Sequence, residues 1–403
     1  MSLGGQFTVS PDIFAVAGIF TAIIGIALAP LIPAHWSGRI GADSISNVLQ
    51  ILASSMLAVT TFSLATMVSA YATASSATTP RVAELLIQDS SAQNALATFV
   101  GSFLFSLVGI IALNAGVYGD SGRVVLFVGT IGVIMVIVIT LLRWIDLLAR
   151  FGRVGDAIDR VEAAATHAMR ARWEHPCIGA RMRQGATPTI TMITSAKIGY
   201  VQHIDVNALD RLATVFDGEI HVDALPGTFV DTASAIAWLS FTPDENTLRA
   251  IRDAFSVGAR RSFDQDPRFG LIVLSEIASK ALSPAINDPG TAIATLTALV
   301  RVLSILAEPR DKQSEVFYPR VFIPALAVDD LFNDAFSPIS ESAAGTLAVG
   351  IRLQKTLRSL SMLKHPEFRA AARHQSVLAL KRARYTLPLA EDVARLELES
   401  SAI

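Results

Sequence analysis

The 403-residue sequence predicts an α-helical membrane domain of about four transmembrane helices, followed by a cytoplasmic α+β domain with a small β-rich subdomain and a helical C-terminal part. The first observation is charge: residues 1–142 hold eight Asp, Glu, Lys or Arg residues, whereas the other 261 hold sixty. The second is that long uncharged stretches occur only before this step. Because a charge in hydrocarbon costs kilocalories, the step near Arg143 predicts a membrane-to-water boundary.

Four windows of the first part lack charged residues, and they predict the membrane helices. The windows are 13–34, 45–80, 90–119 and 124–142, and the helices expected in them span about 13–34, 48–72, 97–118 and 124–142. Each is long enough, since about 20 residues at roughly 1.5 Å per residue cross the hydrocarbon core. No basic segment precedes the first window, and Pro30 and Pro33 stand where a cleavage site would need small residues. We therefore expect a retained helix rather than a signal peptide.

The arginines flanking these helices predict the orientation of the protein. Four crossings leave both chain ends on one side of the membrane. The flank after the fourth helix carries Arg143, Arg150, Arg153 and Arg160, whereas the opposite loops carry only Arg39 and Arg123. By the positive-inside rule, we expect a multi-pass protein of the inner (cytoplasmic) membrane with its large C-terminal domain in the cytoplasm.

The second predicted helix is rich in hydroxyl groups. Twelve serines and threonines fall between residues 54 and 79. The candidates for lining a pore or for packing helices together are Ser55, Thr66, Ser69, Thr73 and Ser76, of which the last four share one helical face. Such a face suits the wall of a water-filled path, and it equally suits a close helix interface. No carboxylate or histidine lies within the windows after the first helix, which disfavours proton-coupled transport.

The second part of the chain divides into three segments by pattern. Residues 143–188 predict a helical connector, 189–241 predict short strands with one helix inserted, and 242–403 predict a helical subdomain. Two of the later helices have clear starts, because Asp266 and Asp288 each precede a proline. Aspartate at the N-cap followed by proline is a common helix beginning.

The same two helix starts define a candidate polar site in the cytoplasmic domain. Its eight residues are Arg260, Arg261, Gln265, Asp266, Glu276, Lys280, Asn287 and Asp288. If folding gathers them, the helix N-termini could hold an anion. The alternative is that the aspartates are caps and the remaining side chains belong to solvated helix faces.

Several function classes are disfavoured by what the sequence lacks. The net charge of −2 and the absence of a polybasic segment argue against nucleic-acid binding. Cys177 is the single cysteine, so no intrachain disulfide or multi-cysteine metal site can form. No P-loop, H-E-x-x-H, G-x-S-x-G or dinucleotide-binding glycine motif occurs. We therefore expect a protein that is not an enzyme and that needs no metal or cofactor.

Three segments resemble a bacterial family of predicted membrane proteins, domain of unknown function 2254. They are SSMLAVTTFSLATMVSAYATASSATTPRVAELLIQD with the following FVGSFLFSLV, then GYVQHID with PGTFV, and last RRSFDQDPRFGLIVLSEIASKALSPAINDPGTAIATL. The resemblance covers residues 54–306 and implies an N-terminal membrane part and a C-terminal soluble domain, without implying a function. The sequence departs from the family pattern at 76–81, Ala285 and Gly290.

Two functional hypotheses follow from these observations. The first is a homo-oligomer with a channel-like or permeation role, in which the second helix lines a path for an ion or small molecule and the cytoplasmic domain gates or senses. The second is a non-conducting membrane scaffold or regulatory protein that binds a partner or small ligand through its cytoplasmic domain. Acid–base catalysis by Asp266, Glu276 and Asp288 ranks below both, because it requires one shared cleft.

Overall fold

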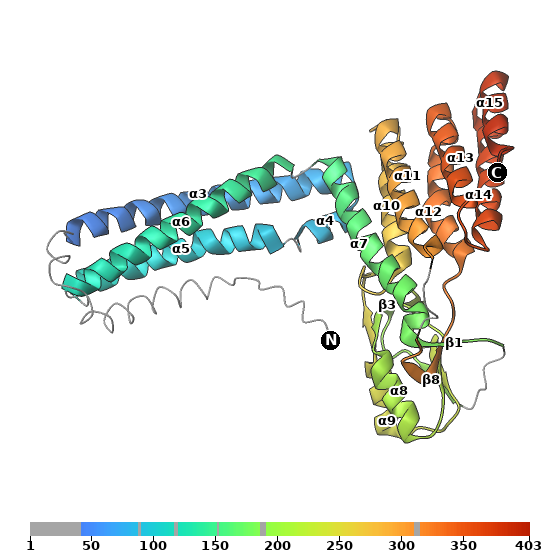
Figure 1. The fold of residues 1–403 in the computed structure, drawn as a ribbon, viewed down its shortest axis with the longest axis horizontal. Helices are drawn as coiled ribbons and strands as arrows, with labels where there is room; N and C mark the ends of the chain where they lie inside the picture. The colour runs from blue at the N-terminus through green and yellow to red at the C-terminus, as the bar shows by residue number, and fades with distance from the viewer. Residues whose placement is uncertain (1–41, 88–89, 117–119, 151–152, 186–190, 310–314) are drawn as a thin grey trace. The chain divides into compact units, whose positions relative to one another are not determined.

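The computed structural model describes residues 42–87, 90–116, 120–150, 153–185, 191–309 and 315–403, and Figure 1 shows their helices and strands. The chain forms two compact units. The N-terminal unit takes in the residues up to Ser76 and Pro80–Asp156, and the C-terminal unit takes in Ala77–Thr79 and Ala157–Ile403. The predicted helix at 13–34 lies outside the described residues.

Helices alone make up the described part of the N-terminal unit. They are α3 (Ala42–Ala77), α4 (Pro80–Ile87), α5 (Ser90–Asn114) and α6 (Asp120–Arg150). Three segments of them are long and apolar enough to cross a membrane: Asp43–Thr73, Ser91–Asn114 and Gly122–Ala149. The structure thus has an apolar helix, long enough to be a candidate span, at each of the three positions predicted after the first window. Helix α6 continues past Leu142 to Arg150, so the drop in hydropathy falls inside a helix rather than at its end.

Helix α3 contacts α5 and α6 through a stripe of buried side chains. Ile45, Leu49, Met56 and Met67 recur at spacings of about one, two and three helical turns and are at most 9% exposed. Leu49 packs with residues of α5 and α6, including Phe105, Leu113 and Leu126. The stripe explains why a helix without charged residues in its middle has a defined buried face.

The C-terminal unit contains two small sheets. Its strands are β1 (Ala180–Met182), β2 (Thr191–Thr194), β3 (Gly199–Ile204), β4 (Ile220–Val222), β5 (Phe229–Val230), β6 (Ala235–Leu239), β7 (Phe255–Gly258) and β8 (Tyr318–Ile323). One sheet has the order β1-β8-β4-β6-β2 and the other β5-β3-β7. Strand β8 runs parallel to both β1 and β4. The sheets therefore extend beyond 189–241, because β1, β7 and β8 join through pairings distant in sequence.

Helices complete the C-terminal unit. They are α7 (Val154–Glu174), the 3-10 turn η2 (Pro176–Gly179), α8 (Val206–Val215), α9 (Glu245–Asp253), α10 (Pro267–Ala281), α11 (Pro289–Ser304), the 3-10 turn η3 (Ile305–Ala307), α12 (Val328–Ser342), α13 (Leu347–Ser361), α14 (Phe368–Thr386) and α15 (Ala390–Ser400). From α10 to α15 they pack side by side (Figure 1). Asp266 and Asp288 cap α10 and α11 through backbone N–H groups, as predicted.

Candidate functional site

The hydroxyl-rich face of α3 is not covered by α5 or α6 in the described part of the chain. Ser69, Thr73 and Ser76 are exposed, and Ser55 and Thr66 are half-buried. Thr66 donates its hydroxyl hydrogen bond to the carbonyl of Phe62 at 2.8 Å, and Ser55, Thr73 and Ser76 bond in the same way within the helix. These hydroxyls are thereby satisfied by their own helix.

The buried hydroxyls in the described part of the N-terminal unit lie on α3, at Ser63, and on α5 and α6. On α5, Ser102 and Ser106 are fully buried and each donates to the carbonyl four residues earlier. Thr130 of α6 is buried and bonds to Leu126. Small hydroxylated residues at such positions allow helices to approach closely. The described structure thus shows hydroxyl-mediated packing on α5 and α6.

The eight residues of the predicted polar site fall at different places along α10. Arg260, Arg261, Gln265 and Asp266 lie at or before its beginning, whereas Lys280, Asn287 and Asp288 lie at or beyond its end, with Glu276 between. Ten residues separate Asp266 from Glu276, which is about 15 Å along a helix. The fold therefore does not gather the eight into one cleft.

At the start of α10, Arg261 and Asp266 form a buried ion pair. Arg261 Nε and Nη2 donate to the two carboxylate oxygens of Asp266 at 2.7 and 3.0 Å, and the Asp266 side chain is 0% exposed. Asp266 also accepts from the N–H groups of Arg268 and Phe269. Burial raises the pKa of Asp266, and Arg261 opposes this shift. Because Asp266 already occupies the helix N-terminus, no anion is needed there.

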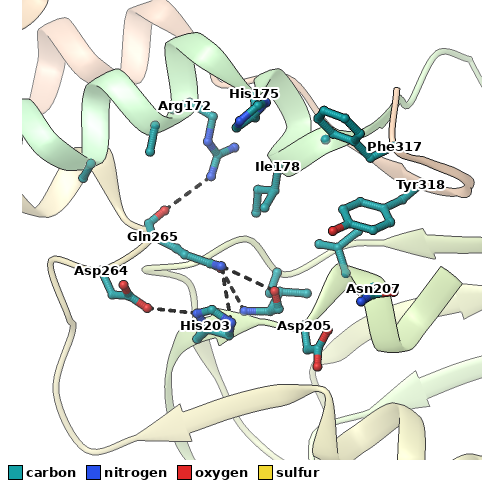
Figure 2. Close-up of a pocket in the computed structure, with 15 residues that line it drawn as sticks. Arg172, His175, Ile178, His203, Asp205, Asn207, Asp264, Gln265, Phe317 and Tyr318 are labelled. Carbon is teal, nitrogen blue, oxygen red and sulfur yellow. Dashed lines mark hydrogen bonds and ion pairs between the residues drawn. The ribbon is translucent and has the colours of Figure 1, made fainter. Parts of the chain in front are cut away.

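A cavity of about 500 Å³ lies where the end of α7 meets β3 and the beginning of α8. One wall is apolar, with Ile178 from the η2 turn and the rings of Phe317 and Tyr318 beside β8. Figure 2 shows these rings on the opposite side of the cavity from Arg172. A concave, mostly apolar space with a few polar groups is the usual form of a small-molecule site.

Arg172, in the last turn of α7, is the most unusual residue of this cavity. It is 7% exposed, and its Nη2 donates a long hydrogen bond of 3.4 Å to the carbonyl of Gln265. Its Nη1 is buried without a hydrogen-bond partner in the described part of the chain. Burial lowers the pKa of the Arg172 guanidinium, and the negative charge of the nearby Asp266 carboxylate opposes this shift. A guanidinium has five N–H donors, so this side chain has unused capacity for an anionic group.

The backbone next to Arg172 is strained. Cys177 and Ile178 have positive φ angles of 54° and 58°, and Gly179 follows at 79°. A β-branched residue such as Ile178 is disfavoured in this region because its branched side chain crowds the backbone. The turn places Ile178 and Gly179 in the cavity wall, and the Gly179 carbonyl accepts from Phe317 N–H at 2.9 Å. Strain of this kind is typical of ligand-binding segments.

The floor of the cavity carries a histidine held in place by two neighbours. His203 Nδ1 lies 2.9 Å from Asp264 Oδ2, and His203 Nε2 lies 3.5 Å from the amide nitrogen of Gln265 (Figure 2). Gln265 accepts from Ile204 N–H at 2.9 Å, which fixes its position. Among the described residues, no group of three or more histidine, cysteine or carboxylate side chains could hold a metal ion.

Of the predicted polar residues, only Gln265 lines this cavity, and Arg172 was not among them. A sequence signal for Arg172 does exist. The buried side of α7 runs through Ile158, Val161, Ala165 and Ala168 at helical spacing. Arg172 stands four residues after Ala168 and therefore continues the apolar stripe. An arginine on the buried face of an amphipathic helix indicates a buried cation.

Comparisons with known proteins agree with the membrane character of the N-terminal unit. The chain is 25% identical over 266 residues to uncharacterized proteins of Mycobacterium bovis and Mycobacterium tuberculosis, a match that covers 61% of this chain. It spans 50% of the length of these curated relatives. No solved structure matches the chain. The sequence profile described as "Predicted membrane protein (DUF2254)" matches residues 5–359. The chain therefore belongs to this family of membrane proteins.

Proposed function

We propose that this protein is a membrane-anchored receptor whose C-terminal unit binds a small molecule in the cavity beside Arg172. The observation that carries the proposal is the buried Arg172 guanidinium with a donor left unused at a cavity of about 500 Å³. A buried charge without full pairing is costly in an empty site, and it becomes favourable when a ligand pairs with it. The strained turn through Ile178 supports the same site.

The receptor function corresponds to a regulatory, non-conducting role. The arginines that follow Leu142 favour a cytoplasmic location of the C-terminal unit. Helix α7 follows α6 in the chain and ends at the cavity, so it is the segment through which ligand binding could reach the membrane helices. This arrangement favours a ligand sensor over an enzyme as the function of the C-terminal unit. Among the described residues of the cavity no activated nucleophile is apparent, and the His203–Asp264 pair is half-exposed.

Thermal unfolding of the full-length protein in nanodiscs tests the receptor proposal. The protein is heated with pools of small metabolites, and an Ala171→Trp variant is heated in parallel. Ala171 is exposed and lines the cavity, so tryptophan there fills the cavity without entering the core. Ala370→Trp, on the exposed face of α14, is the matched control. We expect a pool that raises the melting temperature of the wild type and of Ala370→Trp but not of Ala171→Trp. Equal responses of all three proteins, or none, would refute the proposal.

A second candidate function is permeation by a homo-oligomer, and the exposed hydroxyl row of α3 favours it. Ser69, Thr73 and Ser76 are not packed on α5 or α6, so another surface or water is available to them in the described structure. The hydroxyls of Thr73 and Ser76 bond to carbonyls of their own helix, which makes them equally compatible with lipid. Reconstituted protein under voltage, tension or osmotic shock tests this role. We expect conductance that Thr73→Trp abolishes and Val138→Trp, on an exposed apolar position of α6, leaves intact.

A further inference from the structure

The charges and the apolar wall of the cavity limit the chemical class of ligand that it can bind. This inference rests on the receptor function proposed above. Arg172 supplies one buried positive charge with an unused Nη1 donor. Nearby Asp266 cannot satisfy it, because that carboxylate is held by both Nε and Nη2 of Arg261. Among the described residues no acceptor bonds to Arg172 Nη1, so a ligand acceptor that carries negative charge would satisfy this donor.

The two carboxylates of the cavity limit how much negative charge a ligand can bring. Asp205 caps α8 by accepting from Ala208 N–H at 2.8 Å, and Asp264 is paired with His203 at 2.9 Å. Both carboxylates therefore have partners within the chain, and a carboxylate repels an anionic ligand group placed next to it. A single negative charge balances Arg172, whereas a doubly charged phosphate would be repelled by these groups. The charge balance favours a monoanion, and the planar guanidinium favours a planar carboxylate.

The apolar wall opposite Arg172 determines which kind of apolar group the rest of the ligand can carry. Ile178 stands between Arg172 and the rings of Phe317 and Tyr318 (Figure 2). The two ring centroids are 6.4 Å apart, and Phe317 also meets His175 edge-on at 5.4 Å. Such a wall offers apolar contact and ring-edge contact to a flat or branched group. Phe317 is 48% exposed, so a ligand body can cover it.

We infer that the cavity binds a small monocarboxylic acid, with its carboxylate on Arg172 and an aromatic or aliphatic body against Ile178, Phe317 and Tyr318. Two sources supply acids of this chemistry: water-soluble aromatic acids and fatty acids released from the membrane. The shared feature is one carboxylate joined to an apolar body that fits in about 500 Å³. The two rings favour the aromatic acid.

Calorimetric titration of the full-length protein in nanodiscs tests this inference with four probes: phenylacetate, octanoate, phenylacetamide and phenyl phosphate. We expect phenylacetate to bind at least about tenfold more tightly than its neutral amide and than phenyl phosphate, which corresponds to one charge-assisted hydrogen bond. Tighter binding of octanoate than of phenylacetate would support a carboxylate ligand and would indicate a fatty acid released from the membrane rather than an aromatic acid. Arg172→Met should remove the preference for acid over amide, and Arg170→Met, which lies outside the cavity lining, should preserve it.

The outcome also separates this inference from the receptor function. Equal binding of phenylacetate and phenylacetamide, tighter binding of phenyl phosphate, or an acid preference that survives Arg172→Met would overturn the carboxylate assignment. If all four probes fail to bind while a metabolite pool still stabilises the protein in an Ala171-dependent way, the carboxylate class is wrong and the receptor function stands. If neither experiment shows binding, both are wrong.

Discussion

Replacing Arg172 with methionine should stabilise the unliganded protein while it removes ligand binding. The guanidinium is 7% exposed and makes a single long hydrogen bond of 3.4 Å to the Gln265 carbonyl. Replacing buried ionic groups by apolar side chains of similar volume is neutral or stabilising by about 1–4 kcal/mol when no charged partner is left behind. Losing the hydrogen bond to Gln265 lowers the free energy of unfolding by about 1 kcal/mol. We therefore expect a net gain of up to about 3 kcal/mol.

Arg261→Met is the matched control, because this arginine is also largely buried but is fully engaged. It donates twice to Asp266, whose side chain is 0% exposed. Removing one partner of a buried ion pair leaves the other charge unpaired and costs about 3–5 kcal/mol. The two arginines should thus respond in opposite directions to the same substitution, although both lie near the start of α10.

Thermal unfolding of the three proteins in one detergent measures the difference. A change of 1 kcal/mol corresponds to about 2–4 °C in a domain of this size. We expect Arg172→Met to melt several degrees above the wild type and Arg261→Met to melt well below it. A loss of 1 kcal/mol or more in Arg172→Met would mean that Arg172 is a structural clamp on Gln265. The basis for a ligand site would then disappear.

Three further predictions concern the frame around the cavity. Gly227→Ala should destabilise the protein by about 2 kcal/mol, because φ is 92° and the new Cβ would lie 2.3 Å from Asp266 Oδ2; urea titration measures it. Gly270→Val should cost about 1–3 kcal/mol in the same assay, since even a Cβ would lie 2.3 Å from the Cβ of Ala165. Asp288→Ala should cost about 1 kcal/mol at pH 7 as a lost cap. Hydrogen bonds to the Asp288 carboxylate lower its pKa, so its contribution is present above the ordinary value of about 3.9 and is lost as the pH falls through the lower folded value. The effect of Asp288→Ala on the melting temperature should therefore shrink at pH 3, and an undiminished effect would contradict this reasoning.

Local features of the sequence were sufficient to predict the helices and their caps. The uncharged windows predicted α3, α5 and α6, since long apolar stretches have one structural solution in a bilayer. The Asp-Pro pairs predicted the starts of α10 and α11 because a cap involves only the next few residues. The proposed roles of the hydroxyl face remain predictions.

The cavity could not be predicted from local patterns because residues distant in sequence form it. Strand β8 brings Phe317 and Tyr318 beside the end of α7 only through its parallel pairing with β1 and β4. The eight-residue polar cluster failed to form for a related reason: proximity in sequence does not make neighbours of residues at opposite ends of a 15-residue helix. Arg172 on the apolar stripe of α7 was the one local indication of the site.

Helix α11 presents a conflict between composition and packing. The segment Pro289–Ala307 is apolar enough to cross a membrane, like the three candidate spans of the N-terminal unit. Its apolar side chains are instead buried against α10 and α13, and Arg301 forms an ion pair with Glu162 of α7. Arg352 also donates to the hydroxyl of Thr297 at 3.0 Å. A membrane helix would have its apolar face in lipid, and an arginine there would be expensive. We therefore expect α11 to be a buried helix of the water-soluble unit.

Cysteine labelling decides this question and the orientation together. In a Cys177→Ser background, Ala294→Cys on the exposed side of α11 is compared with Val138→Cys on an exposed apolar position of α6. A membrane-impermeant maleimide should label the first in inside-out vesicles and leave the second unlabelled in vesicles of either orientation, because lipid covers that position. Labelling of Ala294→Cys in right-side-out vesicles alone would place the C-terminal unit outside the cytoplasm. Val138→Cys should stay unlabelled in both orientations. If Ala294→Cys also stayed unlabelled in both, α11 would cross the membrane. Its packing against α10 and α13 would then not hold in the bilayer.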